Sequence, residues 1–181
     1  MEHSMTDTLV VIVQVALIVC VADLISGVAH WAQDRFDTRS IPVFNELFIY
    51  KANEHHLHPN RSSQYSWLTR NKYALIISIF FIFPAWLCSF LSWQTGLLIL
   101  VLLFSSEIHI ACHRPNNHKN WLVNKLQKIG CIQSNQHHLQ HHQNDNTHYC
   151  IITNYVNPVV DKIGFFPLLD RIIIKNIRVT S

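Results

Sequence analysis

Charged residues are scarce and unevenly distributed in this chain of 181 residues. They make up 14% of the sequence, and neither residues 1–32 nor residues 73–112 contain a lysine or an arginine. All fourteen basic residues lie between Arg35 and Lys72 or beyond Cys112. In a chain that is 49% apolar, two long stretches without basic residues are typical of membrane segments.

Motifs for a bound redox cofactor are also missing. The sequence contains no G-x-G-x-x-G, no flavin or haem motif and no cysteine pattern of an iron–sulfur cluster. The five cysteines are odd in number and form no C-x-x-C pair, so we interpret them as buried reduced thiols. This excludes a disulfide framework and a zinc knuckle, and any redox chemistry would need electrons from a separate carrier.

The apolar stretches predict about three membrane-spanning helices. Leu9 to Ala32 would form a helix of roughly 36 Å at about 1.5 Å per residue. Tyr73–Trp93 carries no charge, and Gly96–Cys112 is largely apolar, with a turn expected at Gln94-Thr95-Gly96. A cleaved signal peptide is disfavoured because Met1–Thr8 has no basic residue and the helix continues past Asp23. We therefore expect an all-α, multi-pass integral membrane protein with a single domain over residues 1–181.

The basic residues predict the orientation. Those of the 33–72 loop and those after Cys112 would lie on one side, which the positive-inside rule makes cytoplasmic. The N-terminus and the turn at Thr95 would face outward. The expected location is the bacterial inner membrane, or the endoplasmic reticulum if the protein is eukaryotic.

Thirteen histidines are present, and most of them are clustered. Neutral imidazole is the commonest protein ligand for late transition metals. With three spans, every cluster arrives at the same face, so we expect one polynuclear centre at the cytoplasmic membrane boundary. The clustered histidines are His30, His55, His56, His109, His113, His137, His138, His141 and His142.

Spacing along the helices supports a common centre. His109 and His113 are four residues apart and would lie on one helix face. Asp23, His30 and Asp34 share a stripe down the first helix, with Asp34 at the wet end, where it could bind a metal. Asp23 lies in an apolar run and needs a partner. It either orients a ligand such as His30 or makes a polar contact between helices without a role in chemistry.

Four histidines do not fit this pattern. His3, His118 and His148 stand alone in polar surroundings, and we expect each to be a solvated loop residue. His58 precedes Pro59 and could belong to either class.

Six motifs in order resemble those of the Kua or plasmanylethanolamine desaturase family. The resemblance extends from about residue 22 to residue 167. The motifs are Ala22-Asp23-x-x-Ser26-Gly27-x-x-His30-Trp31-x-x-Asp34, Glu54-His55-His56-x-x-Pro59, Ile108-His109-x-x-x-His113, His137-His138-x-x-His141-His142, Tyr149-Cys150-Ile151-x-Thr153 and Asp161-Lys162-Ile163-Gly164-Phe165.

The resemblance implies a membrane lipid desaturase with two non-haem iron ions and O₂ as co-substrate. It assigns iron to His30, His55, His56, His109, His113, His141 and His142, with Asp34 as a further ligand. One of His137 and His138 completes the set, and the motifs do not separate them. The chain departs from the family pattern at His58, Glu107, Ile110-Ala111 and Asn154-Tyr155, which concerns substrate identity more than the iron site.

The expected reaction converts an alkyl ether phospholipid, a plasmanyl lipid, to the vinyl ether of a plasmalogen. Removing hydrogen from an unactivated C–H bond needs redox-active iron and O₂. Alternatives are an acyl-lipid desaturase acting near the glycerol, a zinc-dependent membrane lipid hydrolase, and a metal or haem carrier without catalysis. We expect a ferredoxin or a cytochrome b5-type protein as electron donor and no nucleic acid as partner. Residues 120–129 and the segment after Asn157 are expected to form interfacial amphipathic helices.

Overall fold

The computed structural model describes residues 2–35, 56, 58 and 64–174, and every regular element within them is helical. The all-α prediction is confirmed for this part of the chain. The helices are α1 (Glu2–Arg35), α4 (Trp67–Leu87), α5 (Trp93–His113), η4 (Asn116–His118), α6 (Trp121–Lys128), α7 (Asn135–Gln143), α8 (Val156–Lys162), α9 (Phe165–Leu169) and the π-helical turn η5 (Asp170–Ile174).

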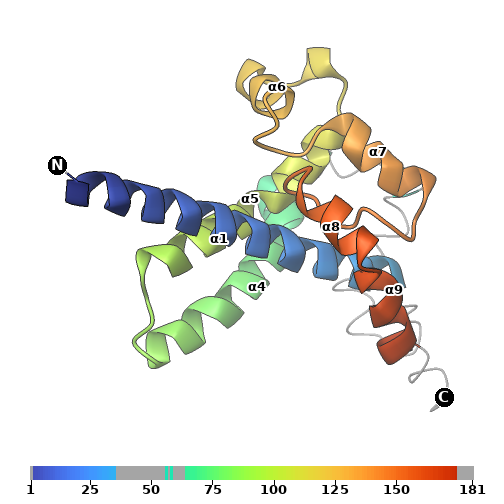
Figure 1. Ribbon diagram of the computed structural model, residues 1–181. Helices are drawn as coiled ribbons and strands as arrows, with labels where there is room; N and C mark the ends of the chain where they lie inside the picture. Colours follow the sequence, from blue (N-terminus) through green and yellow to red (C-terminus); the bar gives the residue numbers. More distant parts are fainter. Residues whose placement is uncertain (1, 36–55, 57, 59–63, 175–181) are drawn as a thin grey trace.

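Three long helices form the body of the molecule. α1 and α5 run in the same general direction and pack against each other, while α4 runs back along α5 (Figure 1). The short helices gather around the end where α1 and α5 finish (Figure 1). The C-terminal ends of two long helices therefore meet the part of the chain that carries most of the clustered histidines.

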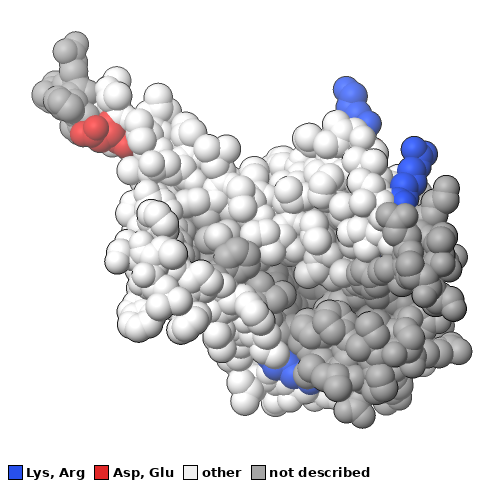
Figure 2. Space-filling view, turned by 90° about the horizontal axis from the view of Figure 1, so that it is seen from below, with Lys and Arg blue, Asp and Glu red and all other residues white. Residues whose placement is uncertain are grey.

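Two of the three predicted spans have the length and composition to cross a membrane: Met5–Arg35 and Trp93–His113. For α4, which carries Arg70 and Lys72 in its first turns, the described residues show a shorter apolar stretch, Ala74–Leu87, so the third span stays a prediction. Large apolar side chains of α1 point outward, among them Leu9, Ile12 and Leu17. Figure 2 shows a broad uncharged face between acidic atoms near the N-terminal end and basic atoms farther along the molecule. Such a surface suits lipid better than water.

The turn between α4 and α5 lies earlier than predicted. α4 ends at Leu87, and α5 begins at Trp93, so Gln94-Thr95-Gly96 lies inside the first turn of α5. The prediction is wrong because it overlooked the cap: the hydroxyl of Ser92 accepts a hydrogen bond from the Thr95 amide over 3.4 Å. α4 and α5 are further joined by an ion pair in which Arg70 contacts both carboxylate oxygens of Glu107, at 2.9 and 3.1 Å.

The segment 149–153 is buried although it is neither helix nor strand. Its backbone finds partners in polar side chains around it, as a buried loop requires. Asp23 Oδ1 accepts from the Ile152 amide at 2.8 Å, and Oδ2 accepts from the Thr153 amide at 2.9 Å and the Thr153 hydroxyl at 2.6 Å. The Asn157 side chain accepts from the Cys150 amide and donates to the Cys150 carbonyl, both at 2.8 Å. These contacts fix the segment beside α1.

Two short helical segments agree with the sequence prediction. α6 covers most of residues 120–129, and the helix expected at Asn157-Pro158 is α8. Gly164, with a φ of +68°, separates α8 from α9, a conformation that favours glycine. Pro167 does not interrupt α9, because it lies in the first turn of this helix, where no backbone N–H donates a hydrogen bond within the helix.

The cysteines are free thiols, but only two of the five are buried. Cys112 and Cys150 lie in the interior, whereas Cys20, Cys88 and Cys131 are exposed. The expectation of five buried thiols is therefore wrong for these three. Cys20 lies on the lipid-suited surface of α1, and the other two lie beside turns.

Candidate metal centre

Three helices and one isolated residue bring the ligating side chains together. α1 contributes His30 and Asp34 from its last two turns, and α5 contributes His109 and His113 from its last turns. α7 contributes His138, His141 and His142, and its N-cap Ser134 accepts from the His137 amide over 3.2 Å. His56, from the part of the chain that precedes α4, belongs to the same cluster.

One group consists of His30, Asp34, His56 and His141, whose ligand atoms all lie within 4.8 Å of one another. Asp34 is at its centre. Its Oδ2 lies 3.6 Å from His30 Nε2, 3.2 Å from His56 Nε2 and 3.2 Å from His141 Nε2. Three imidazole nitrogens thus converge on one carboxylate oxygen.

A second group consists of His109, His113 and His138, with ligand atoms again within 4.8 Å. His138 Nε2 lies 2.9 Å from Nε2 of His109 and 2.9 Å from Nε2 of His113. His142 Nε2 lies 3.2 Å from the same atom and extends this group. Four nitrogens meeting around one point is an arrangement that a bound cation explains.

The two groups are neighbours. The ring centroids of His30 and His109 are 5.0 Å apart, and those of His56 and His142 are 4.7 Å apart. Two metal ions held this way would share one compact site.

Backbone carbonyls determine which nitrogen can bind a metal. His30 Nδ1 lies 3.0 Å from the Tyr149 carbonyl oxygen, and His141 Nδ1 lies 2.8 Å from the Thr147 carbonyl oxygen. Because a carbonyl only accepts, each Nδ1 carries the proton and donates it, which leaves the Nε2 lone pair available. Both Nε2 atoms and Asp34 Oδ2 are buried and make no hydrogen bond within the described residues. Buried acceptors in this state fit a metal ion, so the donor set suits the predicted centre.

The surroundings of His138 and His142 favour neutral imidazoles. Burial lowers the pKa of His138 well below its ordinary value, and nearby histidines lower it further. Burial and the neighbouring His56 lower the pKa of His142 to about 4. In contrast, the Asp34 carboxylate raises the pKa of His56, because it stabilises the protonated ring. A bound cation would take the place of that proton.

Several predicted residues lie elsewhere. His137 faces away from the cluster: its Nε2 is 3.1 Å from the Asn157 side-chain nitrogen, and its ring packs against His148. Asp23 contacts no imidazole within the described residues, where its partners include the backbone of Ile152 and Thr153, and its role in orienting a ligand stays a prediction. It fixes the segment that contains the Tyr149 carbonyl. His55 lies outside the described residues.

The four histidines that were not assigned to the predicted centre have different surroundings. His58 and His118 are exposed. The side chain of His3 is not described. His148 is half-buried, and its Nδ1 lies 3.1 Å from the Asp161 carboxylate, so the expectation of a solvated loop histidine is wrong for this residue. The sequence also gave no reason to select the carbonyls of Thr147 and Tyr149, because every residue has a carbonyl and only the fold places these two.

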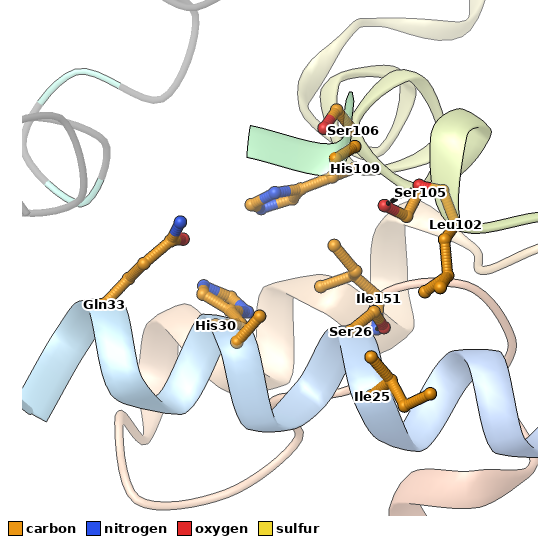
Figure 3. A pocket seen from close by; sticks show the side chains of 11 residues that line it. Ile25, Ser26, His30, Gln33, Leu102, Ser105, Ser106, His109 and Ile151 are labelled. Carbon is orange, nitrogen blue, oxygen red and sulfur yellow. Dashed lines mark hydrogen bonds between the residues drawn. The ribbon is translucent and has the colours of Figure 1, made fainter. Parts of the chain in front are cut away.

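A cavity of about 90 Å³ adjoins both ligand groups. It lies between α1, α4 and α5, and Figure 3 shows the imidazoles of His30 and His109 at its border. The other lining residues are Ile25, Ser26, Ala29, Gln33, Ala74, Leu102, Ser105, Ser106 and Ile151.

Comparison with known proteins places the chain in a family. The chain matches the family model described as lipid desaturase domain over residues 19–181. It is 26% identical to plasmanylethanolamine desaturase 1 of Mus musculus over 84% of this chain and 61% of the relative. It is 27% identical to plasmanylethanolamine desaturase of Myxococcus xanthus over 84% of this chain and 56% of the relative.

A plant protein is equally similar. The chain is 29% identical to the chloroplastic fatty acid desaturase 4 of Arabidopsis thaliana over 83% of this chain and 48% of the relative. The chain thus spans about half to three-fifths of the length of these curated relatives. No solved structure matches it. Since the family model covers nearly the whole chain and the relatives carry the names the motifs led us to expect, the chain belongs to the lipid desaturase domain family.

Proposed function

We propose that this chain is a single-domain, O₂-dependent desaturase of membrane glycerolipids with a di-iron centre. The observation that carries the proposal is the pair of adjacent ligand groups at the ends of α1 and α5. These two helices are long and apolar enough to cross a membrane. A metal pair at that place would act on a lipid from within its own bilayer.

Iron would supply the redox chemistry that acid–base catalysis cannot, namely oxidation of an unactivated C–H bond by O₂. The protein's own residues would bind the two ions and orient the ligating side chains. His30, Asp34, His56 and His141 would hold one ion, and His109, His113, His138 and His142 the other. The carbonyls of Tyr149 and Thr147 fix His30 and His141 by hydrogen bonds, which preserves the geometry of the site. His55 stays a proposed ligand by the family resemblance alone.

The preferred substrate in this proposal is an alkyl ether phospholipid, which would become a vinyl ether. Each turnover would remove two hydrogens from adjacent carbons and reduce O₂ to two waters with two electrons and two protons. The names of the mouse and Myxococcus relatives favour this substrate. The plant relative's name favours an acyl chain instead, and this is the second candidate.

The two electrons would come from a separate protein. The exposed side chains of Lys125 and Lys128 on α6 would suit an acidic ferredoxin or a cytochrome b5-type donor. In the proposed topology, α4 is the third span, and the metal centre and α6 face the cytoplasm.

The test is lipid analysis of cells that express the chain or its His141→Ala variant. Acid-labile vinyl ethers should accumulate with the unchanged chain and disappear with the variant. A new double bond in an ester-linked chain instead would move the assignment to the acyl substrate. If the lipids of both cultures are identical to those of cells without the protein, while the protein is present in the membrane, the desaturase assignment fails.

A further inference from the structure

The cavity beside the metal centre is lined by residues of α1, α4, α5 and one loop segment. Five of its lining residues lie on one face of α1, and others come from α4, α5 and the segment after Tyr149. Its volume of about 90 Å³ far exceeds the roughly 10–15 Å³ that a single water needs, so it has room for several methylene-sized groups. None of the eleven lining residues is a lysine, arginine, aspartate or glutamate.

The lining has an apolar wall and a polar end. Ile25, Leu102 and Ile151 form the wall, while Ala29 and Ala74 leave space between α1 and α4. Burying an ionised group against such a wall would be costly, so the phosphate of a headgroup is excluded. A segment of aliphatic chain carries no charge and can therefore lie against this wall.

Two of the three serines that line the cavity already donate hydrogen bonds to backbone carbonyls. The Ser26 hydroxyl donates to the Asp23 carbonyl at 2.7 Å, and the Ser105 hydroxyl donates to the Leu102 carbonyl at 2.7 Å. Gln33 differs, because its side chain extends into the same space as the imidazoles of His30 and His109 (Figure 3). A primary amide offers donors and an acceptor there.

We propose that this cavity holds the part of a glycerolipid chain that reacts, and that Gln33 positions it by donating a hydrogen bond to the chain's ether or ester oxygen. The proposal rests on the function proposed above and deepens it. With the oxygen held at Gln33, the neighbouring methylenes lie between His30 and His109, at both metal sites. Gln33 is thus a positioning residue for the carbons next to that oxygen.

The first test measures binding without turnover. Iron-loaded protein is kept free of O₂ in phosphatidylcholine vesicles that contain a 1-O-hexadecyl phosphatidylethanolamine with a photoactivatable diazirine near its ether oxygen. Crosslinks should map to residues 25–33 of α1 and residues 102–109 of α5. Ala29→Leu fills the cavity and should reduce these crosslinks at least tenfold, whereas the matched control Ala16→Leu, on the exposed part of α1, should not.

Unchanged crosslinking in Ala29→Leu, or crosslinks confined to other segments, would overturn the assignment of the cavity. This outcome does not depend on catalysis, so it is distinct from a failure of the proposed function. An ester-linked probe with the same label decides which of the two chain types the cavity prefers.

The second test addresses Gln33. Gln33→Leu should raise the KM for the ether lipid about three- to tenfold, the range expected for one lost hydrogen bond. It should also spread the double bond over more than one position of the chain, while iron content stays unchanged. A merely structural role would lower the amount of product without moving the bond. A Gln33→Leu enzyme with the unchanged KM and one product position would refute the role, and Gln14→Leu on the same helix is the control.

Discussion

At the residue scale, adjacent histidines have different surroundings. His138 is almost completely buried and points its Nε2 at His109 and His113, whereas His137 turns toward Asn157 and His148. On a helix, neighbouring residues point about 100° apart, and on α7 this places His138 toward α5 and His137 toward Asn157 of α8. The motif spacing did not distinguish His137 from His138 as a ligand. In the fold, only His138 lies beside His109 and His113.

The choice can be tested with two alanine variants. His138→Ala removes the nitrogen nearest to three other imidazoles, so we expect the iron content to fall by at least half and the activity to disappear. His137→Ala should keep its iron, since its ring contacts Asn157 and His148. Metal analysis of both purified proteins checks this, and iron loss in His137→Ala together with full iron in His138→Ala would reverse the assignment.

At the scale of elements, much of the site depends on how α1 meets the segment 149–153. Gly27 makes this approach possible. A methyl group on its Cα would lie 2.6 Å from Cys150 Sγ and 3.1 Å from both the Cα and the amide nitrogen of Cys150. The Tyr149 carbonyl that accepts from His30 is next to Cys150 in the chain. The close packing of Gly27 against Cys150 therefore helps to position a proposed metal ligand.

Gly27→Ala should therefore destabilise the protein by about 1–3 kcal/mol, the usual cost of overpacking, although alanine favours helices. Thermal unfolding in detergent measures this. The matched control is Gly96→Ala in α5, where a methyl group meets nothing within 4 Å and should leave stability unchanged or raise it by up to about 1 kcal/mol. Equal effects of the two substitutions would show that the close contact with Cys150 does not matter.

The sequence predicted elements better than contacts. Apolar length located α1 and α5, and an imidazole repeat of four residues placed His109 and His113 on one face. The position of α4 was missed by several residues, because the Ser92 cap was read as part of a span. Asp23 was recognised as needing a partner, but that partner is a backbone segment about 130 residues away in sequence, which local patterns do not reveal.

At the scale of the whole molecule, the proposed topology separates two exposed native cysteines. Cys88 lies in the turn after α4, and Cys131 lies between α6 and α7. If α4 crosses the membrane together with α1 and α5, these two thiols are on opposite sides.

A maleimide that cannot cross membranes should therefore label Cys88 in intact cells and label Cys131 only after permeabilisation. Mass spectrometry of the purified protein identifies the labelled residue. Labelling of Cys131 from outside would invert the orientation, and labelling of both residues from one side would mean that α4 does not cross.

The central claim is that seven or eight described side chains form one site for two metal ions. Metal analysis of the purified full chain tests it most directly. We expect two iron ions per chain. His113→Ala and His141→Ala should each lower the iron content, because each substitution removes a ligand from a different group. A single zinc ion per chain, with no iron bound under anaerobic reconstitution, would contradict the account.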